Sequence, residues 1–207
     1  MSLPGALKHS RTRPANLKLN CYLRLMSVRT PITETEGIYF ITFTCAQWLP
    51  LIELTNGYDM VYKWFDYLKS KSHFVKGFVI MPNHLHVLID FSTSSKSINT
   101  TVSNGKRFMA YEIVKRLQEQ NRHEILFKLQ DEVVSSDKDR GKKHQVFERS
   151  FDCKPITTQD FFLEKLNYMH NNPCSGVWKL VDNPVDYKHS SAKHYFSGER
   201  GVYTIDD

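Results

Sequence analysis

The feature that most constrains this chain is a pair of apolar runs separated by only two residues. The first run, HFVKGFVIM, covers residues 73–81, and the second, HLHVLIDF, covers residues 84–91. Both are rich in β-branched and aromatic residues, which favour strands, and the Pro82-Asn83 pair between them is a tight-turn signal. Because strands joined by so short a turn must be antiparallel, the two runs predict an antiparallel hairpin.

Periodicity elsewhere predicts the remaining elements of the fold. Runs rich in β-branched and aromatic residues indicate strands, and apolar residues at helical spacing indicate helices. The expected strands are 37–48 and 146–151, and the expected helices are 56–70, 106–120 and 157–172. Taken in chain order with the hairpin, these elements predict an α+β sandwich, an antiparallel sheet with helices packed on one face.

Two segments between these elements are dominated by polar residues. Residues 91–104 are expected to form a loop that leads into a helix, and residues 131–145 a charged, flexible insertion. The last expected helix has Thr157 or Thr158 as its N-cap, and Pro173 marks its end.

Composition fits one domain with a modest extension. The chain has 207 residues, of which 41% are hydrophobic and 24% charged, which is enough to bury a core. We expect a basic extension over residues 1–33 and a single domain over residues 34–207. No run of about 18 apolar residues is present, so we expect no membrane span. The cysteines are scattered without a CxxC pair, which indicates reduced cytosolic thiols; they are Cys21, Cys45, Cys153 and Cys174.

The positive charge is concentrated at the N-terminus. The formal net charge is +6, and the first 33 residues contain six Lys or Arg and no acidic residue. The rest of the chain is therefore neutral overall. A basic arm of this kind can lie along phosphates, and it can equally be a solvated tail.

His84 and His86 stand one residue apart on the second strand of the expected hairpin. Alternate side chains of a strand point to the same face, so the two imidazoles project together, with Leu85 and Val87 on the other side. Two imidazoles on one rigid face make a bidentate metal platform. The alternative is a pair of histidines that are hydrogen-bonded at the edge of a sheet.

A second group of polar residues, YMHNN, lies at the end of the last expected helix. Residues four apart on a helix share a face, so Tyr168 could lie beside Asn172, whose amide oxygen can bind a hard cation. Pro173 disfavours the helical conformation at Asn172. The alternatives are a core tyrosine with its hydroxyl in water and a simple helix stop. His170 would point away from Tyr168, toward the protein or toward DNA.

Together, these segments resemble the HUH superfamily. MPNHLHVLID is similar to its histidine–hydrophobic–histidine motif, and YMHNNP is similar to the C-terminal tyrosine helix of the single-tyrosine transposases, especially the REP-associated ones. VFERSFDCKPI and DYKHSSAKHY resemble two further segments of that family. The likeness covers about residues 37–195, and it implies a ferredoxin-like or RRM-like HUH fold with the histidines on a central strand.

The resemblance also implies roles. His84, His86 and Asn172 would be metal ligands, with Mg²⁺ or Mn²⁺ as the divalent metal, and Tyr168 would be the nucleophile. The chain would be a transposase that cleaves and rejoins single-stranded DNA near hairpins or palindromic repeats through a 5′-phosphotyrosine. It would act in the cytoplasm of a prokaryotic cell, associated with the nucleoid. Some relatives are homodimers that share the tyrosine helix, and others act as monomers.

Two alternatives to this reading remain open. The first is a domesticated protein that binds DNA hairpins without cutting them. The second is a fold stabilised by zinc through His84 and His86, for which the sequence offers no second cluster of Cys or His. For DNA contacts, Lys106 and Arg107 at the start of the expected helix are candidates, since single-strand binding uses basic grooves; a solvated helix end is the alternative.

Overall fold

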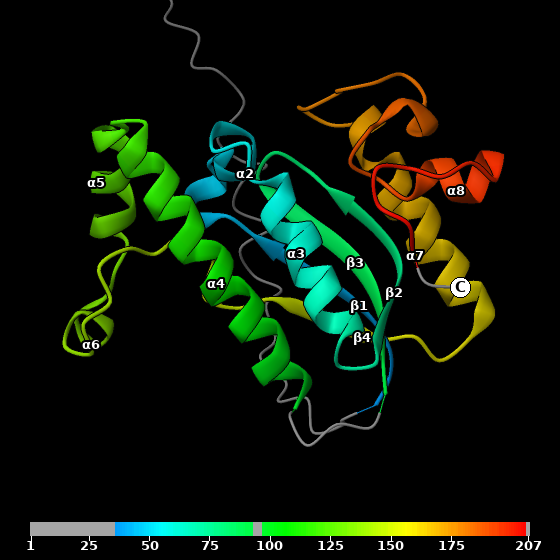
Figure 1. The fold of residues 1–207 in the computed structure, drawn as a ribbon, viewed down its shortest axis with the longest axis horizontal. Coiled ribbons are helices and arrows are strands. Elements are labelled where there is room, and N and C mark those ends of the chain that lie inside the picture. The colour runs from blue at the N-terminus through cyan, green and yellow to red at the C-terminus, as the bar shows by residue number, and fades with distance from the viewer. Residues whose placement is uncertain (1–35, 93–96, 206–207) are drawn as a thin grey trace, which may run out of the picture.

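The structure is built on a four-stranded antiparallel sheet with the strand order β2-β3-β1-β4 (Figure 1). It is a computed structural model that describes residues 36–92 and 97–205. The basic extension expected over residues 1–33 lies outside the described residues. The strands are β1 (Gly37–Thr44), β2 (His73–Ile80), β3 (His84–Phe91) and β4 (Asp152–Pro155). The hairpin expected from the two apolar runs is confirmed as β2 and β3.

The helices lie on both faces of this sheet. They are α2 (Leu51–Leu54), α3 (Tyr58–Lys69), α4 (Ile98–Glu119), α5 (His123–Asp131), α6 (Ser135–Lys138), α7 (Gln159–Asn171) and α8 (Ala192–Ser197). Figure 1 shows α3 and α4 on one side of the sheet and α7 on the other. The expectation of helices on one face is therefore wrong, although the α+β class with an antiparallel sheet is confirmed. None of the described helices combines the length and apolar character needed to cross a membrane.

The side chains of the sheet alternate between two separate cores. The larger core lies between the sheet and helices α3 and α4, and includes Phe43, Phe65 and Leu85. The smaller core lies between the sheet and α7, and includes Phe40 and Leu88. Alternation along each strand sends neighbouring residues to opposite faces, so one strand serves both cores.

The strand expected at 146–151 is wrong. Phe147 makes only an isolated bridge to Cys45, and the strand that pairs with β1 begins at Asp152. The physical reason lies in the segment that follows β1. Beyond Thr44 the backbone enters a 3₁₀ turn over Ala46–Trp48, so residues 146–151 have no extended strand to pair with there. The three described cysteines, Cys45, Cys153 and Cys174, are free thiols.

The loop expected over residues 91–104 is also partly wrong, because α4 begins at Ile98. Ser97 is the N-cap, and its Oγ accepts a hydrogen bond from the Thr100 backbone N–H at 3.2 Å. Ile98 and Val102 are buried one turn apart, so this polar-looking segment has an apolar face. Within the charged segment 131–145, residues 135–138 form the short helix α6.

The C-terminal segment covers the exposed edge of β2. Ser191 donates its backbone N–H to the Phe78 carbonyl at 3.0 Å, and its Oγ accepts the Phe78 N–H at 2.9 Å. Ser190 forms an isolated antiparallel bridge with Val79. Covering an edge in this way protects the unpaired backbone groups of the strand.

Candidate active site

The two histidines project from the central strand β3 toward the α7 face of the sheet. Their ring centroids are 4.8 Å apart, and they are 7% and 5% exposed. The neighbouring Leu85 and Val87 are fully buried in the larger core on the other face. The pairing of strands places Thr44 opposite His84 and Thr42 opposite His86, so β1 supplies the polar neighbours of the pair.

Each imidazole is oriented through its Nδ1 atom. The Nδ1 of His84 lies 2.7 Å from the Asn83 amide oxygen, and the Nδ1 of His86 lies 2.6 Å from the Thr42 hydroxyl. Because an amide oxygen only accepts, His84 donates from Nδ1, which leaves a lone pair on Nε2 of the neutral ring. Such hydrogen bonds to the far nitrogen are what fix the orientation of metal-binding histidines.

Burial keeps both rings neutral. It lowers the pKa of His84 to about 4, an effect that a hydrogen bond with the Asn172 side chain partly offsets. It holds the pKa of His86 well below its ordinary value, and the neighbouring His84 adds to the shift. A neutral imidazole is the form that binds a metal ion.

Helix α7 brings Tyr168 onto the same face. The Tyr168 ring lies 5.3 Å from the His86 ring and 6.2 Å from the Phe40 ring, between centroids. The Tyr168 side chain is 54% exposed, so the ring rests against the histidine pair while remaining accessible. The Tyr168 ring is therefore not part of the buried core.

Close packing against β2 fixes the position of α7. Thr158 is the N-cap, as expected, and its Oγ1 accepts the Phe161 backbone N–H. Gly77 lies directly beneath the helix: a Cβ atom there would be 2.5 Å from the Met169 Cε and 2.8 Å from the Leu166 Cδ1. The absence of a side chain at Gly77 therefore lets the ends of the Met169 and Leu166 side chains pack directly on the strand.

Asn172 reaches the histidines in spite of the proline that follows it. Helix α7 ends at Asn171, and Asn172 keeps helical angles (φ −56°, ψ −45°) as the chain enters a 3₁₀ turn that contains Pro173. Its side chain hydrogen-bonds His84. The constraint from proline disfavours this conformation but does not prevent it, so Asn172, His84, His86 and Tyr168 lie in one site.

His170 has a separate, structural position. It is fully buried, and its Nε2 lies 2.8 Å from the Ser191 Oγ. Since Ser191 also bonds the backbone of β2, this contact joins α7 to the segment that covers the edge of the sheet. Of the two expected directions for His170, the structure places it toward the protein.

Three residues at the site were not singled out from the sequence. Thr42 and Asn83 orient the histidines, and Trp48 lies beside His84 with ring centroids 6.3 Å apart. Trp48 is 54% exposed and has a positive φ of 58°, and its carbonyl accepts a hydrogen bond from the Asn83 Nδ2 at 3.1 Å. No sequence pattern marks Thr42 or Trp48, because their roles depend on strand register and on a turn.

Lys106 and Arg107 lie on α4, across the sheet from the histidines, and not at the start of a helix. Lys106 is only 9% exposed, and its Nζ donates to the carbonyls of Glu148 and Ser150 at 2.8 and 3.1 Å. Burial lowers the pKa of Lys106 to about 8. The alternative of a solvated helix end is therefore wrong for Lys106, whose ammonium is bonded to backbone, whereas Arg107 is exposed.

The side chains that could hold a divalent cation at this site are of two chemical kinds, imidazole and amide. Within residues 36–92 and 97–205, no group of three or more His, Cys, Asp or Glu side chains could hold a metal ion. The site instead offers two neutral imidazoles and an amide oxygen, a combination compatible with Mn²⁺ or Mg²⁺. The same finding gives no support to a zinc site built on a larger cluster in this part of the chain.

Comparison with known proteins supports the fold. No family model matches the chain, and neither does any curated protein. The structure of a REP-associated tyrosine transposase bound to a REP hairpin superposes with a TM-score of 0.54 at 14% identity, covering 88% of this chain and 93% of that chain. A candidate transposase from Deinococcus radiodurans R1 gives 0.40 at 11% identity, over 69% and 95% of the two chains. The chain thus shares the fold of the first transposase, as the HUH resemblance implies.

Proposed function

We propose that this protein is a metal-dependent transposase or endonuclease that cleaves and rejoins single-stranded DNA. The observation that carries the proposal is the position of Tyr168, which is exposed and lies against His86. Asn172, four residues later, hydrogen-bonds the other histidine, His84. The shared fold with a tyrosine transposase that was solved with a REP hairpin supports the same assignment.

In this reaction Tyr168 is the nucleophile. Its phenolic oxygen attacks the scissile phosphorus in line and forms a phosphotyrosine with the 5′ side of the break. The phenolic proton passes to water, the bond from phosphorus to the 3′ oxygen breaks, and that oxygen takes a proton from water and leaves as a 3′-hydroxyl. Because the new link keeps the phosphodiester energy, attack by another 3′-hydroxyl reverses the step and rejoins DNA without ATP.

The surrounding residues position the phosphate and its metal ion. His84, His86 and Asn172 would hold Mg²⁺ or Mn²⁺, which when bound polarises the phosphate and stabilises charge in the transition state. Thr42 and Asn83 hold the two imidazole rings in place through Nδ1.

A nearby cation could help to bring the DNA to the tyrosine. The Nζ of Lys165, one turn before Tyr168 on α7, lies 6.0 Å from the Tyr168 ring centroid and is paired with the exposed Glu164 carboxylate at 2.7 Å. Exchange of that carboxylate for a phosphate would place the anion beside the tyrosine.

The direct test is formation of a covalent adduct. Single-stranded DNA carrying an inverted repeat from the flanks of the gene is incubated with the protein and Mn²⁺ or Mg²⁺, and the adduct is resolved on a denaturing gel. We expect an adduct with the unmodified protein and none with Tyr168→Phe. Tyr67→Phe is the matched control, because Tyr67 is a partly exposed tyrosine on the other side of the sheet, and it should retain the adduct.

The outcomes separate the proposal from its alternative. An adduct that persists in Tyr168→Phe contradicts the mechanism. Hairpin binding without any adduct, unchanged in Tyr168→Phe, would indicate a domesticated DNA-hairpin-binding protein. A mixture of His84→Ala and Tyr168→Phe proteins tests assembly: recovered cleavage means that a homodimer shares the tyrosine helix across subunits, and no recovery means that each chain works alone.

A further inference from the structure

A second polar site lies on the opposite side of the sheet from Tyr168. A groove of about 920 Å³ is formed between α4 and the segment 136–149. On the α4 side it is lined by Ser103, Arg107 and Tyr111, which are spaced one turn apart. The other side includes part of the charged segment 131–145, for which the resemblance to transposases suggests no counterpart.

The groove is strongly basic. Besides Lys106, its lining includes Arg107, Lys115, Arg140, Lys142, Lys143 and Arg149, against the acidic Asp137 and Glu148. Asp137 is shared by the guanidinium groups of Arg140 and Arg149, at 2.7 and 2.9 Å. In the part of the chain that the structure describes, Arg107 and Lys143 form no salt bridge. The groove therefore carries excess positive charge that is open to an anionic partner.

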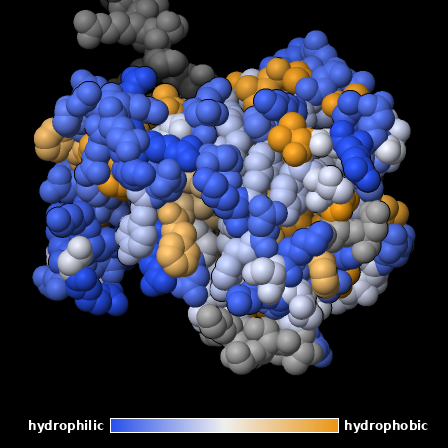
Figure 2. Space-filling model, viewed as in Figure 1, coloured by the Kyte–Doolittle hydropathy of each residue, from blue (hydrophilic) through white to orange (hydrophobic). Residues whose placement is uncertain are grey.

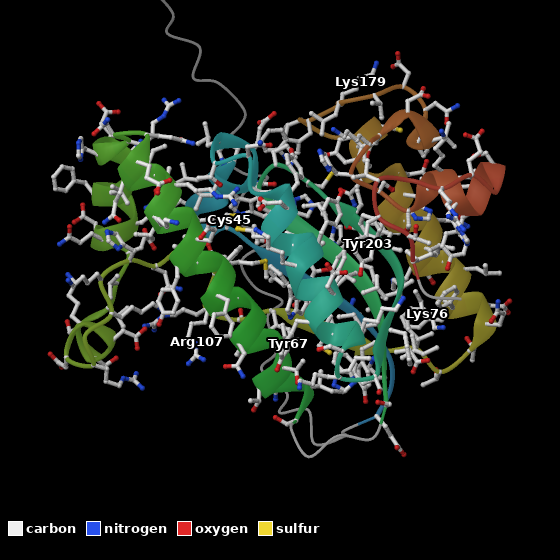
Figure 3. All side chains as sticks on the ribbon, viewed as in Figure 1. Cys45, Tyr67, Lys76, Arg107, Lys179 and Tyr203 are labelled. Carbon is white, nitrogen blue, oxygen red and sulfur yellow. The ribbon has the colours of Figure 1, made fainter. Side chains whose placement is uncertain are left out.

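The two sides of the groove are held at a fixed separation. The Lys106 Nζ on α4 donates to the carbonyls of Glu148 and Ser150 on the facing segment. That segment is also bonded to the end of β1, because the Glu148 N–H donates to the Thr44 carbonyl at 2.8 Å. Lys106 thus links the two sides of the groove. Arg107, the next residue, projects on the side of α6 (Figure 3).

An exposed aromatic ring lies among these charges. Tyr111 lines the groove and is 65% exposed, while Phe108 on the same helix is 63% exposed and lies beneath the Arg107 guanidinium, 5.3 Å from ring centroid to Cζ. The surrounding surface over α5 and α6 is mostly hydrophilic (Figure 2). Solvent-exposed aromatic rings beside basic side chains are the arrangement by which proteins bind unpaired nucleotides, since bases stack on the ring and phosphates meet the cations.

We propose that this groove is a second, non-catalytic binding site for single-stranded DNA. Arg107 and Lys143 would contact phosphates, and a base would stack on Tyr111. The choice of DNA as the nucleic acid rests on the proposed function, but the groove would hold a segment of strand remote from the one attacked by Tyr168. It would thereby let one molecule hold the DNA on both sides of its sheet.

The test measures binding without cleavage. In a Tyr168→Phe background, affinity for a fluorescent oligothymidine is measured by anisotropy over a range of salt concentrations. The slope of log K against log salt is negative, and each lost phosphate contact reduces its magnitude by about 0.7. Arg107→Glu with Lys143→Glu should therefore reduce the magnitude of the slope by about 1.4. The matched control, Lys71→Glu with Arg200→Glu, makes the same charge change at two exposed positions outside the groove and should leave the slope nearly unchanged.

Tyr111 provides a second, independent readout. Tyr111→Ala should weaken binding about 10-fold through loss of stacking, whereas Tyr111→Phe keeps the ring and should bind normally. An equal loss of slope in the groove and control variants overturns the proposal. The proposal is also overturned if the protein binds duplex DNA more tightly than single strands and Tyr111→Ala leaves the affinity unchanged. Since no adduct is involved, a protein that forms no phosphotyrosine yet loses binding in the groove variants would refute the proposed function and leave this site standing.

Discussion

The two faces of the sheet are covered very differently. On the face packed by α3 and α4, 28 buried residues form one continuous core, whereas six form the core beneath α7. Strand β3 serves both: Leu85, Val87 and Ile89 enter the large core, while His84 and His86 face α7. The histidines are therefore held by a strand whose other side is fully packed.

This difference places most of the apolar core on one face and the proposed catalytic residues on the other. Burial of apolar surface is the main favourable term in folding, and most of it lies on the α3 and α4 face. The α7 face can then hold two neutral imidazoles and an exposed tyrosine, groups that contribute little to a core. The packed face behind β3 holds the histidines rigidly, as the proposed catalytic role would require.

The largest expected effect tests where the stability lies. Phe65 on α3 is fully buried and packs against Phe78 and Tyr203, with ring centroids 5.3 and 5.4 Å away. Phe65→Ala should lower the free energy of unfolding by about 3–5 kcal/mol, and Leu166→Ala, in the small core, by about 2 kcal/mol. Urea denaturation measures both. If Leu166→Ala costs as much as Phe65→Ala, the contrast between the faces is wrong.

The hairpin and the histidine pair were predictable because they depend on local sequence. A two-residue turn fixes the direction of the strands, and the period of two puts His84 and His86 on one face whatever surrounds them. The N-cap at Thr158 is local for the same reason. The link between Tyr168 and the histidines came only from the resemblance to transposases, since no local pattern places a helix over a particular sheet face.

The errors have a common physical origin in long-range packing. Lys106 looks like a surface residue in sequence, but its position between α4 and residues 148–150 gives its ammonium two carbonyl partners. The sequence could not place α7 on the second face either, because that depends on the packing of Leu166 and Met169 against residues from distant strands. Thr42 became recognisable only once the register of β1 against β3 was known.

A smaller effect should separate activity from stability on the α7 face. Thr42→Val keeps the shape of the side chain but removes the hydroxyl that lies 2.6 Å from the His86 Nδ1. Loss of such a supporting hydrogen bond typically lowers metal affinity or activity about 10- to 100-fold. We expect that loss in the rate of adduct formation. Thr44→Val, opposite His84 on the same strand, is the matched control and should stay near full activity. Equal losses in both would mean that strand packing, and not the hydrogen bond, matters.

The smallest expected effect concerns the contact between α3 and the C-terminal segment at the edge of β2, which we call the seam and which is formed by His189, Tyr58 and Tyr62. There His189 stacks on Tyr58 at 3.5 Å between ring centroids, and its Nδ1 lies 2.9 Å from the Tyr62 hydroxyl. Burial, with a smaller contribution from Lys188, lowers the pKa of His189 to about 4 from an ordinary value of 6.5.

Acid should therefore weaken this seam. Between these two pKa values the unfolded chain binds more protons than the folded one, so the stability from neutral His189 is present above pH 6.5 and lost as the pH falls toward 4. Between pH 7 and 5 the free energy of unfolding should fall by about 1 kcal/mol more in the unmodified protein than in His189→Gln, after allowance for the partial exposure of the ring. Urea denaturation at each pH measures this difference, and His123→Gln, at an exposed position on α5, should follow the unmodified protein. Parallel curves for His189→Gln and the unmodified protein would show that the seam does not respond to acid, and that the two faces lose stability together.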